Sequence, residues 1–204
     1  MISRLNDIKR RVLLLFTFFM PLTVMANATY IVVNDNVISE KVSKKVESLG
    51  SELFSKTGVR VHVSLPASLG KQSIVKYETE LAKTLKEPYI LLTLAKQEEK
   101  VDIIFSEGLE KKFDKDRVLS PFSWSGTILP ILATKKENDK YNAAVLNGYA
   151  DIVEQVAKSQ NIVLEGAIGN INRDIYHYLK FGIYGFLLII FIRYFFNKVR
   201  RKNE

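Results

Sequence analysis

The stretch Tyr89-Ile90-Leu91-Leu92-Thr93-Leu94-Ala95 decides the fold, because every residue in it except Thr93 is apolar. An apolar run this short is typical of a central strand that is covered on both faces. The charged segment Lys96–Lys100 follows, and Val101–Phe105 is predicted as the return strand of a hairpin. The middle of the chain therefore predicts a sheet with helices packed on both sides.

On the N-terminal side, Tyr30–Val33 is predicted as a short β-strand that stops at a polar turn. Ser39 can cap a helix that ends at Gly58, with its apolar residues spaced at a helical period. Val59–Leu65 alternates apolar and polar residues, which predicts a half-buried strand, and a second amphipathic helix is expected over 73–85.

On the C-terminal side, Gly108-Leu109-Glu110 is expected to open a short helix toward Phe113, and a long helix is predicted over 140–157. Alternating strands and helices predict an α/β fold. We expect a three-layer α/β/α domain with a small mixed sheet over residues 27–160, followed by a linker at 161–174.

The two ends of the chain predict export and membrane attachment. Residues 1–26 have a basic start, an apolar middle and a small-residue end, as in a signal peptide cleaved after Ala26 or Ala28. Residues 175–196 predict a transmembrane helix, because as a helix they would measure about 33 Å against a hydrocarbon core of about 30 Å. Lys180 and Arg193 would reach the headgroups from opposite ends. If the signal segment stays uncleaved, the chain is anchored at both ends.

The charge distribution predicts orientation and excludes a nucleic-acid partner. The tail at 197–204 is strongly basic, so it is expected in the cytoplasm, with the main domain on the periplasmic or outer side of the inner membrane. Residues 27–174 carry 20 basic and 20 acidic residues, so they lack the positive excess that phosphate backbones require. The absence of cysteine excludes disulfides and thiolate chemistry.

Few residues suit catalysis, and none is assigned a catalytic role. The chain has no glycine-rich phosphate loop and no nucleophile elbow, and His62 is expected to lie exposed on its strand. Carboxylates from separate loops, namely Asp35, Asp114 with Asp116, and Asp139, would suit a hard cation such as Ca²⁺ or Mg²⁺. Each also has a structural interpretation: Asp35 could satisfy turn amides, Asp114 could lie in a solvated turn, and Asp139 could cap a helix.

Several short segments resemble the TPM domain family over about residues 30–158. These are Val33-Asn34-Asp35, Thr57-Gly58, the Gly108-Leu109-Glu110 motif and the acidic positions at Asp114 and within Asn138–Asn142. Members usually have a glycine where this chain has Ser106, and an arginine near Glu99-Lys100. Without that glycine, a side chain hinders close approach of the backbone to a ligand at this position.

The resemblance implies an exported α/β/α domain, often tethered by one C-terminal span, with an acidic pocket matching Asp35, Asp114 and Asp139. It favours a membrane-anchored accessory module that binds another membrane protein or complex during assembly or maintenance. The alternative that it implies is a weak, divalent-metal-dependent acid phosphatase, in which the cation polarises a phosphoryl oxygen.

Overall fold

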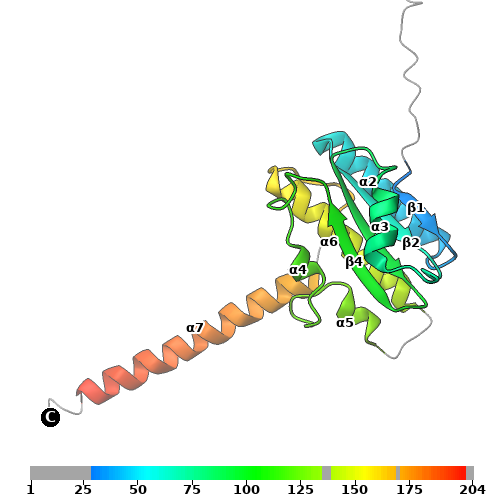
Figure 1. Cartoon of the computed structure of the whole chain (residues 1–204). Coiled ribbons are helices and arrows are strands. Elements are labelled where there is room, and N and C mark those ends of the chain that lie inside the picture. Colours follow the sequence, from blue (N-terminus) through cyan, green and yellow to red (C-terminus); the bar gives the residue numbers. More distant parts are fainter. Residues whose placement is uncertain (1–28, 135–138, 169–170, 201–204) are drawn as a thin grey trace, which may run out of the picture.

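The computed structural model describes residues 29–134, 139–168 and 171–200, and in the last range it describes the side chains of residues 180–195. The predicted signal peptide and the end of the basic tail lie outside the described residues. The described chain forms an α/β domain followed by a long helix (Figure 1).

A four-stranded mixed sheet forms the centre of the domain. Its strands lie side by side in chain order: β1 (Ile31–Asn34), β2 (Arg60–Leu65), β3 (Tyr89–Ala95) and β4 (Lys100–Phe105). The first three strands are parallel, and β4 returns antiparallel to β3 with Ile90 opposite Phe105. The predicted hairpin and the mixed sheet are therefore confirmed.

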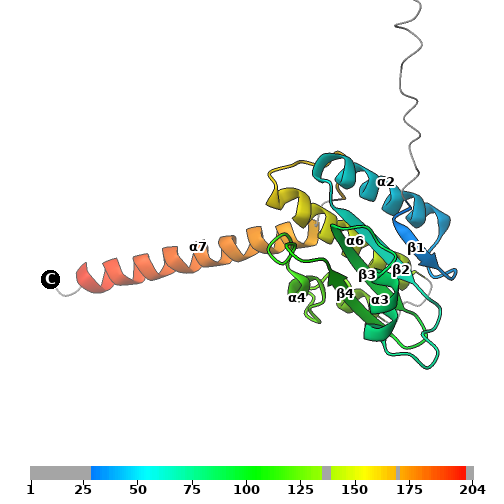
Figure 2. The same ribbon diagram turned by 45° about the horizontal axis from the view of Figure 1, so that its top comes forward.

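Helices cover both faces of the sheet (Figures 1 and 2). The long helices α2 (Glu40–Thr57) and α6 (Lys140–Ser159) pack together on one face, and α3 (Ile74–Ala82) packs on β3 and β4 from the other. Two single-turn helices, α4 (Lys115–Val118) and α5 (Leu129–Leu132), connect β4 to α6.

Local signals set the bounds of α2 as predicted. The Ser39 hydroxyl accepts a hydrogen bond from the Val42 amide, and Gly58 ends the helix with a φ of 73°. On the sheet side, α2 and α6 bury an apolar core with Val61, Val63, Leu92 and Leu94 of the strands. The buried hydroxyl of Tyr149 donates a 2.8 Å hydrogen bond to the carbonyl of Val61, which joins α6 to β2.

The prediction that Val59–Leu65 is half buried was wrong. All residues of β2 after Arg60 are buried, because β2 lies between β1 and β3 and is covered from both faces. Alternation identified the strand correctly, but Ser64 and His62 lie on a second buried face instead of in solvent.

The segment after α6 packs on the domain before the last helix begins. The amides of Glu165 and Gly166 donate to the carboxylate of Glu52 on α2, at 2.6 and 2.9 Å. The amide of Ile168 donates to Glu154 on α6 at 3.0 Å. The described first part of the predicted linker is therefore held against α2 and α6.

The last helix, α7, spans Ile171–Arg200 and points away from the domain in both views (Figures 1 and 2). Its described side chains, residues 180–195, are all exposed, and most are large and apolar. Across the described residues, no helix reaches the combination of length and apolarity that crossing a membrane demands.

Candidate functional site

Asp35 lies at the end of β1 and binds the neighbouring loop. Its Oδ2 accepts a 2.9 Å hydrogen bond from the amide of Ala67, and its own amide donates to the carbonyl of Leu65 at 3.1 Å. These bonds hold the loop after β1 against the loop after β2. The carboxylate therefore performs the turn-stabilising role that one interpretation of the sequence gave it.

Asp139 lies at the start of α6, at the same end of the sheet as the loop that carries Asp35. The link is Ser39, whose amide donates a 2.8 Å hydrogen bond to the side chain of Asn142 in the first turn of α6. The Asp139 side chain forms no capping hydrogen bond, so the capping interpretation is not what the structure shows. Asp139 lines a cavity of about 680 Å³ together with Lys41, Lys44 and Lys45.

Asp114 lies at the other end of α6. Its amide donates to the side chain of Gln155 at 2.9 Å, and its Oδ1 caps α4 by accepting from the Arg117 amide at 2.9 Å. Since α6 rises about 1.5 Å per residue, Gln155 lies about 24 Å along the helix from Asp139.

One cation therefore cannot be shared by all three predicted aspartates, because each ligand oxygen must approach within about 2.3–2.6 Å. Nor does any group of three or more His, Asp or Glu side chains in the described part of the chain have the geometry to hold a metal ion. Binding of Ca²⁺ or Mg²⁺ through fewer aspartates stays a prediction.

The Gly108-Leu109-Glu110 motif forms a turn, so the prediction that a short helix begins there was wrong. Gly108 has a φ of 86°, which disfavours residues with a side chain, and its amide donates to Oε1 of Glu110 at 3.1 Å. Leu109 is buried in the core and fixes the turn. At the position of Ser106, the hydroxyl accepts from the amide of Tyr89, which ties the end of β4 to the start of β3.

His62 was expected in solvent but is only 6 % exposed. Its ring stacks on Tyr30 with the centroids 6.0 Å apart. Burial, with the nearby Arg60 guanidinium, lowers the pKa of His62, so the ring is neutral at pH 7. A buried, neutral histidine away from the carboxylates described above has no catalytic partner among them.

The sequence analysis missed a polar row beneath α3. Thr93 lies opposite Ser64 on one side and Asp102 on the other, so three neighbouring strands present polar side chains to α3. From α3, the Tyr77 hydroxyl lies 2.8 Å from that of Ser64, and Glu78 is fully buried. The sequence did contain a signal of this row, because the acidic residue Glu78 follows Tyr77 on the face of α3 that packs against the sheet.

Glu78 is the most strongly perturbed carboxyl group of this row. Burial, together with the nearby charge of Asp102, raises its pKa to about 7, against smaller opposing effects of Thr93 and Lys115. Thr93 and Asp102 on the sheet are the side chains that interact with this carboxyl group by hydrogen bonding. Lys115 forms a 2.6 Å ion pair with Asp102, which connects this buried row to α4.

These elements define a class of protein: an α/β/α domain with an acidic residue and lysines at one end and a long apolar helix leaving from the other. The family model for the TPM domain (TPM_phosphatase) matches residues 31–155, and the chain belongs to this family.

A solved structure of low sequence identity shares the fold. The N-terminal domain of a protein from P. gingivalis is 15 % identical, with a TM-score of 0.52, over 67 % of this chain and 88 % of that one. The BA42 protein from Bizionia argentinensis is 12 % identical, with a TM-score of 0.42, over 66 % and 96 %. Among curated proteins, none matches the chain.

Proposed function

We propose that this chain is a membrane-tethered TPM domain that binds another membrane protein or complex and supports its assembly or maintenance. The observation that carries the proposal is the exposed apolar surface of α7. Phe181, Phe186, Ile189 and Phe191 are each at least 60 % exposed, and none packs into the core of the domain. A stretch of large apolar side chains this extensive is costly in water and calls for lipid or a partner.

The tether and the export signal together give the proposed location. Residues 175–196 would hold the domain at the inner membrane, with the basic tail in the cytoplasm and the domain in the periplasm. The charge-balanced domain then meets its partner in the plane of the bilayer, and a soluble substrate is not needed.

The tether predicts that Phe186→Lys combined with Ile189→Lys releases the full chain from membranes. Two lysines at the middle of a spanning helix cost about 5–7 kcal/mol. The measurement is the fraction of the chain that floats with membranes after a carbonate wash. Val75→Lys with Val163→Lys is the matched control, because both valines are exposed on the domain itself. Equal flotation of the two double variants contradicts the tether.

The accessory role is tested by purifying the full chain in a mild detergent after cross-linking in cells. We expect a membrane protein to co-purify, and the Asp35→Asn, Asp139→Asn double variant to retain it. Repeated purification of the chain alone would count against the accessory role while leaving the tether intact.

A second candidate is the divalent-metal-dependent acid phosphatase, favoured by one observation. Asp139 shares its cavity with Lys41, and such a cation could stabilise the phosphate that departs. In this candidate Asp139, with or without Asp35, would hold the cation, which would polarise a phosphoryl oxygen.

The phosphatase candidate predicts turnover of a phosphomonoester by the full chain in detergent with Mg²⁺ or Ca²⁺. Asp139→Asn is expected to lower the rate at least about 100-fold, as is typical for loss of an electrostatic catalytic group. Asp114→Asn is the matched control and should keep the rate, because it lies at the far end of α6. Turnover that survives chelation, or no turnover, removes this candidate.

A further inference from the structure

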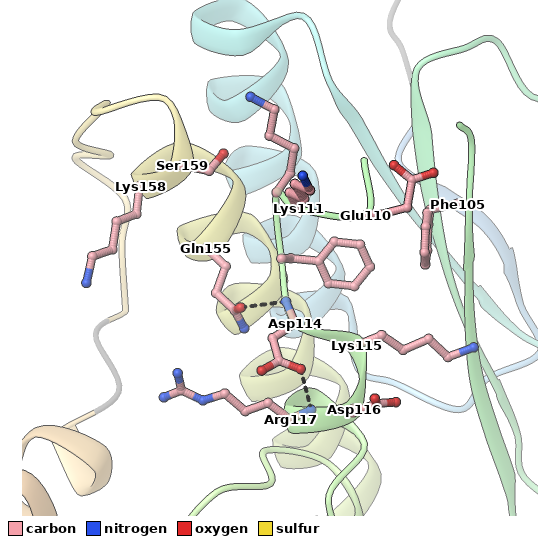
Figure 3. Close-up of a pocket in the computed structure, with 12 residues that line it drawn as sticks. Phe105, Glu110, Lys111, Asp114, Lys115, Asp116, Arg117, Gln155, Lys158 and Ser159 are labelled. Carbon is pink, nitrogen blue, oxygen red and sulfur yellow. Dashed lines mark hydrogen bonds between the residues drawn. The ribbon is translucent and has the colours of Figure 1, made fainter. Parts of the chain in front are cut away.

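A cavity of about 710 Å³ lies between α4 and the C-terminal half of α6 (Figure 3). The close-up shows charged side chains from both helices and from the Gly108–Glu110 turn around it. Basic side chains outnumber acidic ones in the lining: Lys111, Lys112, Lys115, Arg117 and Lys158 against Glu110, Asp114 and Asp116.

Most of the acidic groups are already bound, whereas most of the basic groups are not. The carboxylates of Asp114 and Glu110 accept hydrogen bonds from backbone amides, and Lys115 is paired with Asp102. The other four basic side chains form no ion pair with any residue that the structure describes. The cavity therefore offers several uncommitted cations to an anionic ligand.

The cavity lies at the end of the domain from which α7 departs. Ile168 is bound to Glu154, next to Gln155 in the cavity wall, and α7 begins three residues later at Ile171. In both ribbon views α7 begins beside α4 (Figures 1 and 2). If α7 enters a bilayer, this end of the domain is the one that faces the lipid headgroups.

An exposed aromatic pair lies in the loop that follows α4. The rings of Phe122 and Trp124 stack with centroids 4.7 Å apart, and they are 53 % and 56 % exposed. The loop is closed by the amide of Thr127, which donates to the carbonyl of Val118 at the end of α4. Exposed tryptophan is favoured at the membrane–water interface, as are lysine and arginine on the same surface.

We infer that this cavity binds the phosphate group of an anionic phospholipid, with Phe122 and Trp124 entering the headgroup layer beside it. Ammonium and guanidinium groups donate charge-assisted hydrogen bonds to phosphate oxygens, and each base near an anionic surface strengthens docking about fivefold. The inference rests on the proposed tether and adds to it a ligand class and a fixed orientation of the domain on the bilayer.

The test uses the full chain reconstituted into vesicles, with Trp124, the only tryptophan of the chain, as the reporter. Neutral phosphatidylcholine vesicles are compared with vesicles that also contain phosphatidylglycerol, each carrying a lipid with a quencher on its headgroup. We expect quenching of Trp124 to at least double in the anionic vesicles. The Lys111→Gln, Arg117→Gln, Lys158→Gln triple variant should lower the docked fraction at least about tenfold.

Lys71→Gln with Lys76→Gln is the control, because these exposed lysines lie just before α3 and in its first turn, near the end of β2 and at the opposite end of the sheet from Phe105. It should behave as the unchanged chain does, and circular dichroism should show that both variants are folded. Equal quenching in neutral and anionic vesicles, or a triple variant that docks normally, overturns the inference. If inorganic phosphate added to the chain in detergent changes the fluorescence of Trp124 as anionic vesicles do, free phosphate is the ligand. That outcome also overturns the inference. Loss of flotation with neutral vesicles instead refutes the tether.

Discussion

Replacing Gly50 by alanine is expected to lower the free energy of unfolding by about 3 kcal/mol, although alanine is the better helix former. Gly50 faces inward from the middle of α2. A Cβ there would lie 2.5 Å from Cγ of Tyr30 and even closer to the hydroxyl of Tyr149. Moving Tyr149 breaks its buried bond to Val61, which adds to the overpacking cost and outweighs about 1 kcal/mol of helix propensity.

The measurement is equilibrium unfolding of the full chain in detergent, followed by near-ultraviolet circular dichroism. Ser51→Ala, at an exposed position on the same helix, is the control and should change stability by less than about 0.5 kcal/mol. Combining Gly50→Ala with Tyr149→Phe should cost less than the sum of the two single changes, because both act on the same hydroxyl. Full additivity would show that Gly50 and Tyr149 are not coupled through this contact.

Glu78→Gln is expected to stabilise the protein by about 2 kcal/mol at pH 8 and to have little effect at pH 5. The folded-state pKa of Glu78 is raised to about 7, so the folded protein holds this proton more tightly than the unfolded chain does. The resulting stability is fully present below the unfolded pKa of about 4.5 and is lost as pH rises through about 7. The pKa difference corresponds to about 3 kcal/mol at most.

The measurement is the difference in unfolding free energy between the unchanged chain and the variant across pH 5–8, because other groups titrate equally in both. Glu80→Gln is the matched control, since it removes an exposed carboxylate from the same helix. If the unfolding free energy of the Glu78 variant has the same pH dependence as that of the Glu80 variant, Glu78 is ionised in the folded protein without a cost in stability. That result would contradict the raised pKa of Glu78.

The predictions that held depended on signals confined to neighbouring residues. Ser39 and Gly58 bound α2 because a capping hydroxyl and a left-handed glycine act within one turn of the helix. The apolar run at Tyr89–Ala95 became the central strand, and the charged segment after it became the hairpin connection. Together these signals determined the α/β class, the mixed sheet and the resemblance to the TPM domain family, to which the chain belongs.

Only the tertiary structure decided which chemical groups meet. The family resemblance implied that Asp114 meets Asp35 and Asp139, yet Asp114 binds Gln155, which lies about 24 Å along α6 from Asp139. The alternating pattern of Val59–Leu65 predicted that His62 is exposed. In the structure His62 is buried, because β1 and β3 flank its strand and α3 covers the sheet. Burial and ligand geometry depend on contacts between segments far apart in the chain, so periodicity within one segment cannot supply them.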